Sequence, residues 1–243
     1  MRKLLKKMLR VGLEKLPANV LQHLRLEVEH TLGFGSGTGL GAIGLEEELS
    51  FVRKIARSEI RIIFDVGANV GNWALAARKT FQDAKIYSFE PNPQVFPKLA
   101  HKTMLDANSH VFNIGLGSVN EIKILNHNEN QNSIASFVTS ESMYEINNLK
   151  SEVEVRRLDD LIEESGLPIP CLIKIDVEGW EFEVLLGLGT LLKEIKFVQF
   201  EVSEGTLVAK SSFGIIQSLL ISHNFVIYRH SPIGLIQVQQ ENI

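Results

Sequence analysis

The chain has 243 residues, 44% of them hydrophobic and 22% charged, and a formal net charge of −4 at pH 7. This length and composition predict one soluble α/β domain with a sizeable core and some additions. They exclude two classes of protein, because no apolar run approaches the roughly 18 residues that span a bilayer and, outside the first fifteen residues, no basic patch offers a surface to nucleic acid.

Positive charge is concentrated at the N-terminus, where the first fifteen residues hold six basic side chains and one acidic one. Apolar residues of segment 1–16 fall on a helical stripe beside these charges. The segment is either a peripheral helix on an anionic membrane surface or a solvated helix docked on the domain. We expect residues 1–58 to form a helical extension, in which the glycine-rich segment 33–44 is a mobile flap or a plain linker.

The chain has a single cysteine, Cys171, which lies in the apolar run PCLIKI. We therefore expect a buried structural thiol and no internal disulfide. A reducing compartment follows, and the predicted location is the cytoplasm.

Residues 61–71, RIIFDVGANVG, predict a strand, a tight turn and the start of a helix over 72–81. Gly67 and Gly71 permit a positive φ and let a ligand approach the backbone closely. Asn69 is one of the few other residues that tolerate the left-handed conformation. The turn is therefore a candidate ligand site.

A second strand, over 84–92, ends on Glu90. In a nucleotide-binding βαβ unit a carboxylate at this position accepts the hydroxyl protons of a ribose, so the glycine turn and Glu90 together predict an adenosine-type site. A purely structural role for both is the alternative. A third strand, over 109–114, places Asn113 where such sites often hold adenine, although an isolated Asn is also typical of a turn.

The elements around these strands are expected as follows. A short amphipathic helix over 46–58 leads into the first strand, and a helix after Glu90 begins either at Asn92 and Pro93 or at Pro97 and runs to about residue 106. An insertion then holds extended segments over 121–125, 133–138 and 153–158, a polar loop over 126–132, and a helix over 160–165 with Asp159 as its N-cap.

A buried central strand over 171–176 ends in Asp176, and a helix then begins with Glu178 and Glu181 in its first turn. The next strand, 195–202, brings Glu201 to the same sheet edge. In an open parallel sheet this is the edge at which ligands bind, and four strand-end carboxylates converge there: Asp65, Glu90, Asp176 and Glu201. Lys174 is either an ion-pair partner for these acids or a residue at the sheet edge. A helix over 212–222 and an antiparallel pair, 225–228 with 235–238, follow.

Four motifs occur in a fixed order along the chain: FDVGANVG, SFEPNP, LDDL at 158–161 and IKIDVEGWE. Together they resemble the FkbM family of S-adenosylmethionine-dependent methyltransferases, over roughly residues 64–201. The combination of DVGANVG with IKIDVEGWE is the most specific part of the resemblance. The N-terminal extension and the glycine-rich segment lie outside it.

The resemblance implies a Rossmann-like class I α/β fold: a mostly parallel seven-stranded sheet with a terminal antiparallel hairpin, helices on both faces, and a methyltransferase domain over 59–243. It places Asp65, Gly67 and Gly71 around the methionine part of S-adenosylmethionine and Glu90 on its ribose, with Asn69 of the same turn and Asn113 as further candidate cofactor-binding residues. Asp176 and Glu178 would lie on the methyl-acceptor side. The implied reaction is O-methylation of a hydroxyl on a sugar, glycan or secondary metabolite.

Methyl transfer from a sulfonium is a direct displacement, so the enzyme mainly has to place the acceptor oxygen in line, about 3 Å from the methyl group. A hydroxyl is a poor nucleophile at neutral pH, and Asp176 is our first candidate for the base that accepts its proton. Glu178 and Glu201 assist it, join it as ligands of Mg²⁺, or are simply solvated.

Two other classes of protein would explain part of the pattern. An NAD-dependent oxidoreductase uses the same strand, glycine turn and acid, but DVGANVG lacks the G-x-G-x-x-G spacing that places a helix N-terminus on a pyrophosphate. A non-catalytic protein that keeps the fold and the cofactor would lack an intact acceptor side, whereas Asp176, Glu178 and Gly179 are all present.

Overall fold

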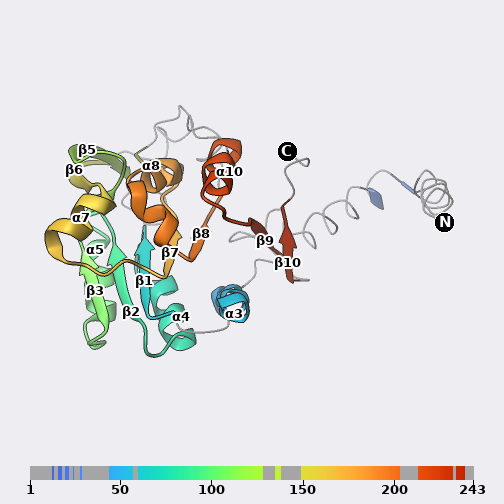
Figure 1. The fold of residues 1–243 in the computed structure, drawn as a ribbon, viewed down its shortest axis with the longest axis horizontal. Coiled ribbons are helices and arrows are strands. Elements are labelled where there is room, and N and C mark those ends of the chain that lie inside the picture. Colours follow the sequence, from blue (N-terminus) through green and yellow to red (C-terminus); the bar gives the residue numbers. More distant parts are fainter. Residues whose placement is uncertain are drawn as a thin grey trace. The chain divides into compact units, whose positions relative to one another are not determined.

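The computed structural model (Figure 1) describes residues 44–56, 60–127, 135–137, 149–202, 213–231 and 234–238, together with positions 13, 16, 17, 20, 21, 24 and 28. The expected N-terminal helices with their membrane-facing stripe, the glycine-rich segment before Gly44 and most of the loop 126–132 lie outside these residues. The chain divides into two compact units, one made of Met1–Phe51 and Ile227–Asn242, the other of Val52–Val226 with Ile243.

The larger unit is built on a five-stranded parallel sheet with the order β3-β2-β1-β7-β8 (Figure 1). This arrangement confirms the Rossmann-like class. The strands alternate with helices along the chain because each short apolar run is followed by a turn and an amphipathic segment. Their bounds are β1 Ile62–Val66, β2 Lys85–Phe89, β3 Ser109–Phe112, β7 Leu172–Ile175 and β8 Phe197–Phe200.

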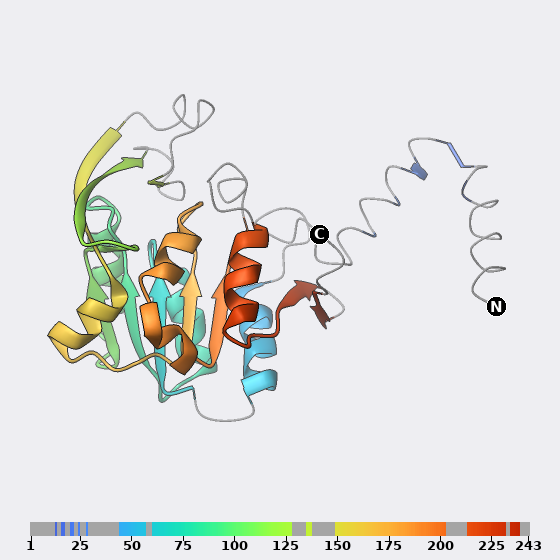
Figure 2. The same ribbon diagram turned by 45° about the horizontal axis from the view of Figure 1, so that its top comes forward.

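Helices cover both faces of this sheet, as expected. Helices α4 (Asn72–Thr80) and α5 (Phe96–Thr103) connect strands that run outward in one direction from β1, whereas α8 (Glu181–Leu186) and the 3₁₀-helix η1 (Gly189–Glu194) connect β7 to β8 in the other. Because parallel crossovers are right-handed, the two directions place their helices on opposite faces. Figure 2 shows this arrangement. Helix α10 (Phe213–Ser222) packs against α8.

The core of the larger unit lies between the sheet and these helices. The Phe64 ring is completely buried, with its centroid 5.2 Å from that of Tyr87 and 5.3 Å from that of Phe89. Strand β7 is buried at all four positions, Lys174 included. The apolar strands on either side of the turn 67–71 are therefore held in place by packing on both faces of the sheet.

Two expectations about helix starts are decided by the structure. Helix α5 begins at Phe96 with Pro97 in its first turn, so the later of the two starts is confirmed. Helix α8 begins at Glu181, so Glu181 lies in its first turn but Glu178 precedes it. Glu178 has a φ of 50°, which is incompatible with a right-handed helix, and its placement in the first turn was therefore wrong.

The insertion forms a separate three-stranded sheet with the order β4-β6-β5. Strand β4 (Gly115–Leu116) runs parallel to β6 (Leu149–Arg156), and β5 (Glu121–His127) runs antiparallel to it. Strands β5 and β6 are longer than expected, because their ends pair with each other rather than following local composition. Of the expected strand 133–138, residues 135–137 are described, and they contribute one isolated bridge between Ser136 and Asn126.

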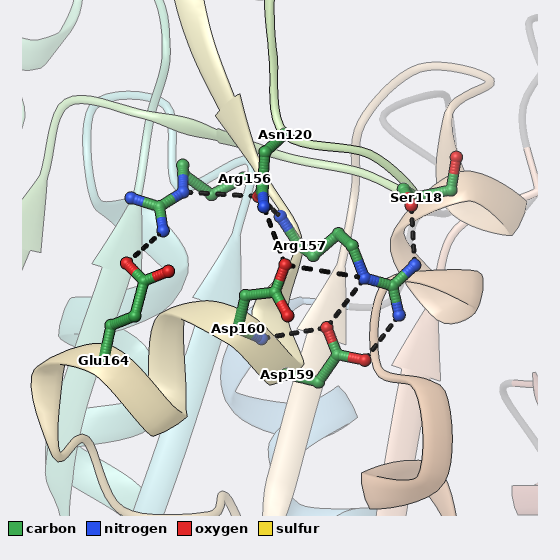
Figure 3. A network of polar contacts seen from close by, with 7 residues as sticks. All are labelled: Ser118, Asn120, Arg156, Arg157, Asp159, Asp160 and Glu164. Carbon is green, nitrogen blue, oxygen red and sulfur yellow. Dashed lines mark hydrogen bonds and ion pairs between the residues drawn. The ribbon is translucent and has the colours of Figure 1, made fainter.

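Helix α7 (Leu158–Ser165) follows β6 directly, and a polar network fixes its start (Figure 3). Arg157 donates from Nε to Asp159 Oδ1 at 3.0 Å and from Nη1 to the carbonyl oxygen of Ser118 at 2.6 Å. The Asn120 side chain accepts from the Arg157 backbone N–H at 2.7 Å and donates to Asp160 at 2.7 Å. Asp159 is not the N-cap, because α7 begins at Leu158 and the N-cap is Arg157; Asp159 lies in the first turn, where its carboxylate binds the guanidinium.

The smaller unit contains the first part of α3 (Leu45–Ala56). It also contains a hairpin made of β9 (Tyr228–Ser231) and β10 (Gly234–Gln237). The ring of His230 lies edge-on to that of Phe51 at 5.7 Å. The antiparallel hairpin is confirmed. Among the described strands, β9 pairs with β10 alone, so the hairpin forms a two-stranded sheet of its own and does not extend the parallel sheet to seven strands.

Two further expectations concern single features. Cys171 is only half-buried, because it lies just before β7 and not within it, so the prediction of a buried thiol was wrong. Within the part of the chain that the structure describes, no helix has the length and apolar character needed to cross a bilayer.

Candidate active site

The candidate site lies where the carboxyl ends of the parallel strands meet, at the point between β1 and β7 where the strand order reverses. Backbone hydrogen bonds continue past the strand ends and hold the following segments together. The Asp176 N–H donates to the Val66 carbonyl oxygen at 3.0 Å, and the Glu201 N–H donates to the Ile175 carbonyl oxygen at 3.2 Å. The predicted meeting of Asp65, Asp176 and Glu201 at one edge is confirmed.

The turn after β1 has the left-handed residues that the sequence predicts. Gly67, Asn69 and Gly71 have φ values of 75°, 48° and 81°. A Cβ atom on Gly67 would lie 1.8 Å from the backbone oxygen of Asp176, so this position requires glycine for space as well as for conformation. The donor turn, which we define as residues 67–71, is thus in direct backbone contact with the segment that carries Asp176.

Glu90 lies at the tip of β2 and is bonded to the donor turn. Its two carboxylate oxygens each accept a backbone N–H at 2.8 Å, one from Asn69 and one from Asn92. The residue is only 6% exposed, and burial raises the pKa of the Glu90 carboxyl to about 7 in spite of these two hydrogen bonds. The carboxylate is therefore fixed in position and changes charge close to neutral pH.

Asn113 follows β3 and is exposed. Its side-chain Nδ2 donates to the carbonyl oxygens of Glu90 at 2.8 Å and Pro91 at 3.2 Å. Asn113 therefore braces the loop after β2, and a contact between its amide and adenine stays a prediction.

Asp65 and Asp176 flank Lys174, which lies in the middle of the site. The Lys174 ammonium is 3.2 Å from Asp65 Oδ1, 3.2 Å from Asp176 Oδ2 and 3.1 Å from the Gly67 carbonyl oxygen. Of the two interpretations of Lys174, the ion-pair partner is confirmed. The signal in the sequence was a lysine inside the otherwise apolar strand CLIKID.

The charges of this cluster support one another. Burial lowers the pKa of Lys174, but the Asp65 and Asp176 carboxylates outweigh it and raise that pKa, so the ammonium stays charged. Burial raises the pKa of Asp65, and Lys174 opposes this change. Because Asp65 is completely buried and Asp176 is 33% exposed at its side chain, only Asp176 presents a carboxylate to solvent.

The acceptor loop, defined here as residues 176–180, is held from several sides. Glu178 and Gly179 have φ values of 50° and 99°, and the buried Glu181 carboxylate accepts the Gly179 N–H at 2.9 Å. Ser136 of the insertion donates from Oγ to the Glu178 carbonyl oxygen at 2.8 Å. Nothing in the sequence indicated this last contact, because Ser136 lies 42 positions from Glu178, in the predicted extended segment 133–138.

Aromatic and basic side chains border the same loop. The Trp180 ring lies 5.6 Å from that of Phe137, and the Lys123 ammonium lies 4.6 Å above the Trp180 ring. These groups come from the insertion and the acceptor loop, and the sequence patterns assigned none of them to the site.

Glu201 is exposed as a residue and lies close to the other acids. Partial burial of its carboxyl group, and then the charges of Asp176 and Glu178, raise the pKa of Glu201 to about 7. Asp176, Glu178 and Glu201 were also considered as ligands of Mg²⁺. Among the described residues, no three His, Cys, Asp or Glu side chains are grouped so that they could hold a metal ion.

The parallel sheet, the glycine turn bonded to an acid at the tip of the neighbouring strand, and the carboxylates across the switch point define an α/β protein of the Rossmann-like class. The model of the methyltransferase FkbM domain matches residues 65–227, and the chain belongs to this family. The assignment confirms the predicted resemblance and favours a methyltransferase over the oxidoreductase alternative.

Two curated relatives are similar over part of their length. The chain is 28% identical to the hexuronic acid methyltransferase AglP of Haloferax volcanii over 145 residues, which cover 59% of this chain and 56% of the relative. It is 26% identical to the 2-O-methyltransferase NoeI of Sinorhizobium fredii over 157 residues, which cover 60% and 65%. The chain thus spans less than two thirds of either relative.

Among solved structures, the chain is similar to the precorrin-6y C5,15-methyltransferase of Geobacter metallireducens, with a TM-score of 0.44 and 13% identity. The similarity covers 75% of this chain and 73% of that one.

Proposed function

We propose that the protein is an S-adenosylmethionine-dependent O-methyltransferase that acts on a hydroxyl group of a sugar, a glycan or a secondary metabolite. Membership in the FkbM family supports methyl transfer. One observation carries the proposal for this chain: the donor turn and the acceptor loop touch, with the position of a Gly67 Cβ only 1.8 Å from the Asp176 backbone oxygen. A methyl donor held by the first lies beside a carboxylate on the second.

The residues of the donor turn fit the cofactor. The left-handed glycines let the turn 67–71 form beside Glu90, and the Glu90 carboxylate keeps lone pairs for the two ribose hydroxyls beyond those that accept Asn69 and Asn92. Bound S-adenosylmethionine would supply an electrophilic methyl group. Asp65 is completely buried, so we assign it a contact with Lys174 rather than with the cofactor.

Asp176 is the group that we assign as general base. When the acceptor oxygen forms its bond to the methyl carbon and the carbon–sulfur bond breaks, the hydroxyl proton passes to the Asp176 carboxylate, so charge and atoms balance. Its position next to the donor turn supports this role, because a base has to lie within hydrogen-bonding reach of the proton that it accepts. Glu178 and Glu201 flank it, and their roles stay predictions.

The name of one relative, a hexuronic acid methyltransferase, supports a carbohydrate acceptor, and that of the other, a 2-O-methyltransferase, supports transfer to an oxygen atom. The Trp180 and Phe137 rings and the Lys123 ammonium beside the acceptor loop supply the apolar faces and positive charge that suit an acidic sugar.

The test is incubation with methyl-labelled S-adenosylmethionine and a panel of hexuronic acids, hexoses and their methyl glycosides. We expect label that survives mild alkali, as an ether does. Label released by alkali would show a methyl ester and overturn O-methylation of a hydroxyl. If the panel stays unlabelled, an extract of the native cell replaces it.

Variants separate the two halves of the site. Glu90→Ala is expected to lose most of the rise in melting temperature that S-adenosylmethionine causes, whereas Asp176→Asn is expected to keep that rise and to retain only a small residual rate of transfer. A protein that binds the cofactor but labels no acceptor from panel or extract would be the non-catalytic alternative.

A further inference from the structure

Lys174 is a buried cation in the central strand β7, and the proposed reaction leaves it without a role. It is 7% exposed as a residue, and a buried ammonium group is costly unless it is fully paired. Any role for this lysine in methyl transfer rests on the proposed function, and it concerns the positions of the groups that the lysine contacts.

Three oxygen atoms surround the Lys174 ammonium at 3.1 to 3.2 Å. It donates a hydrogen bond to the Gly67 carbonyl oxygen and forms ion pairs with Asp65 Oδ1 and Asp176 Oδ2. Because the ammonium is buried among these oxygens, we assign Lys174 no direct contact with a cofactor or an acceptor. A role in the reaction therefore has to pass through the groups that it holds.

Strand geometry explains why these groups meet at one lysine. Asp65 of β1 is the cross-strand partner of Lys174 in the parallel pairing. Asp176 follows Lys174 by two residues, which places both side chains on the same face of the strand. Gly67 follows Asp65 by two residues at the end of β1. Lys174 thus joins the donor turn to the acceptor loop across the switch point.

We propose that Lys174 is a positioning residue for methyl transfer: it fixes the Asp176 carboxylate at a set distance from the Gly67 carbonyl and acts on the reaction through Asp176. The donor turn has other supports, since Gly67 and Ala68 donate to the Phe89 carbonyl oxygen and Asn69 donates to Glu90. Asp176 has a side-chain cation only in Lys174 among the described ion pairs. The lysine therefore matters more for the acid than for cofactor binding.

The test is Lys174→Met, which keeps the length of the side chain and removes its charge. We expect kcat for the acceptor found in the labelling experiment to fall by about 10- to 100-fold, because misplacing a catalytic group by about 1 Å costs roughly that much. The Kd for S-adenosylmethionine, measured by calorimetry, should change by no more than about threefold. Lys102→Met is the matched control, since Lys102 bonds only to Asn72 at the surface among the described hydrogen bonds, and it should leave both quantities unchanged.

A double-mutant cycle distinguishes positioning from a purely structural role. If Lys174 acts through Asp176, then Lys174→Met in the Asp176→Asn background should lower kcat no further. An equal loss of kcat in both backgrounds would overturn the proposal.

A second comparison removes both buried charges, so that neither is left unpaired in the folded protein. Lys174→Met leaves the buried Asp65 carboxylate unpaired, and if it does not fold, Asp65→Asn is added so that both buried charges are absent. The Asp65→Asn/Lys174→Met protein should still show a lower kcat than Asp65→Asn alone, and equal values would overturn the proposal. An inactive wild-type protein would instead refute the proposed function itself, so the two failures are distinguishable.

Discussion

Gly67 is the residue on which the closest contact of the site depends. Its φ of 75° is one obstacle to substitution, and the 1.8 Å that would separate a Cβ atom at this position from the Asp176 oxygen is another. Gly166, the C-cap of α7, presents only the first, because it has a φ of 67° and no atom within 4 Å of a Cβ. Comparing substitutions at the two glycines therefore separates the cost of a left-handed conformation from the cost of a steric clash.

We predict that Gly166→Ala lowers the free energy of unfolding by about 1 kcal/mol, the usual cost of a left-handed non-glycine residue. Gly67→Ala should lower it by about 3 kcal/mol or more, because the backbone that follows β7 must also move. Urea denaturation followed by circular dichroism measures both values. Equal losses of unfolding free energy for the two variants would show that the backbone around Asp176 can move aside at little cost.

Glu90 is the residue whose charge should control cofactor binding. Ribose hydroxyls donate protons, so they bind the ionised carboxylate better than the neutral acid. Because the pKa of Glu90 is raised to about 7, we predict that the affinity for S-adenosylhomocysteine falls as the pH drops below 7, by up to about tenfold per pH unit. Calorimetry between pH 5.5 and 8.5 measures this dependence.

Glu90→Gln is the control for that measurement, since glutamine does not titrate. Its affinity should be lower than that of the wild type at pH 8 and should not vary with pH. A wild-type affinity that is constant across this range would contradict the assignment of Glu90 to the ribose.

At the level of elements, the junction between β6 and α7 depends on one arginine. Arg157 binds Asp159 through two guanidinium nitrogens and the Ser118 carbonyl through a third, a geometry that lysine cannot reproduce (Figure 3). We predict that Arg157→Lys lowers the free energy of unfolding by about 1 to 2 kcal/mol. Thermal or urea denaturation measures the change.

The neighbouring Arg156 is the matched control. It pairs with Glu164 and Glu154, whose side chains are 62% and 49% exposed, and such surface pairs contribute little. Arg156→Lys should therefore change stability by less than about 0.5 kcal/mol. Equal changes in the free energy of unfolding for the two variants would show that the network around Arg157 contributes no more than a surface ion pair.

The elements that the sequence predicted are those with local signals. The strand, glycine turn and helix at 61–80 and the strand ending at Glu90 follow from apolar runs broken by glycine, and the structure confirms them. The extent of β5 and β6 was not predictable, because it depends on pairing between residues 22 to 34 positions apart, from His127 with Leu149 to Glu121 with Val155. Tertiary pairing there overrides local composition.

The same distinction applies to the site. The convergence of Asp65, Asp176 and Glu201 could be predicted, because the ends of parallel strands meet at one edge. The sequence left two interpretations of Lys174 open, and the choice between them could not be predicted, since its partner Asp65 is 109 positions away and the pairing of β1 with β7 had first to be known. Ser136 and Phe137 touch the acceptor loop from the insertion, and no sequence pattern links the two.

For the whole molecule, the raised pKa of Glu90 predicts how stability depends on pH. The unfolded carboxyl has a pKa of 4.5 and the folded one about 7, so between these values the unfolded chain binds fewer protons than the folded one. Stability due to this group is therefore full below pH 4.5 and is lost as the pH rises to about 7, by about 3 kcal/mol at most. The ligand-free protein should show this loss in urea unfolding between pH 5 and 7.5.

Glu90→Gln should remove this part of the pH dependence, although its absolute stability will also change because one backbone N–H loses its acceptor. The comparison therefore uses the slope of the unfolding free energy against pH. Identical slopes for the two proteins would show that Glu90 is ionised in the folded state well below pH 7.

The close approach of Gly67 to the Asp176 oxygen also decides where the protein can be redesigned. No side chain fits at 67, because its Cβ atom would lie 1.8 Å from the backbone oxygen of Asp176. Mutant libraries intended to change the acceptor of the proposed reaction should therefore hold 67 constant, and 176 as well, because Asp176 is the proposed base. Diversity belongs at Trp180 and at its neighbours Phe137 and Lys123, whose side chains take no part in that backbone contact.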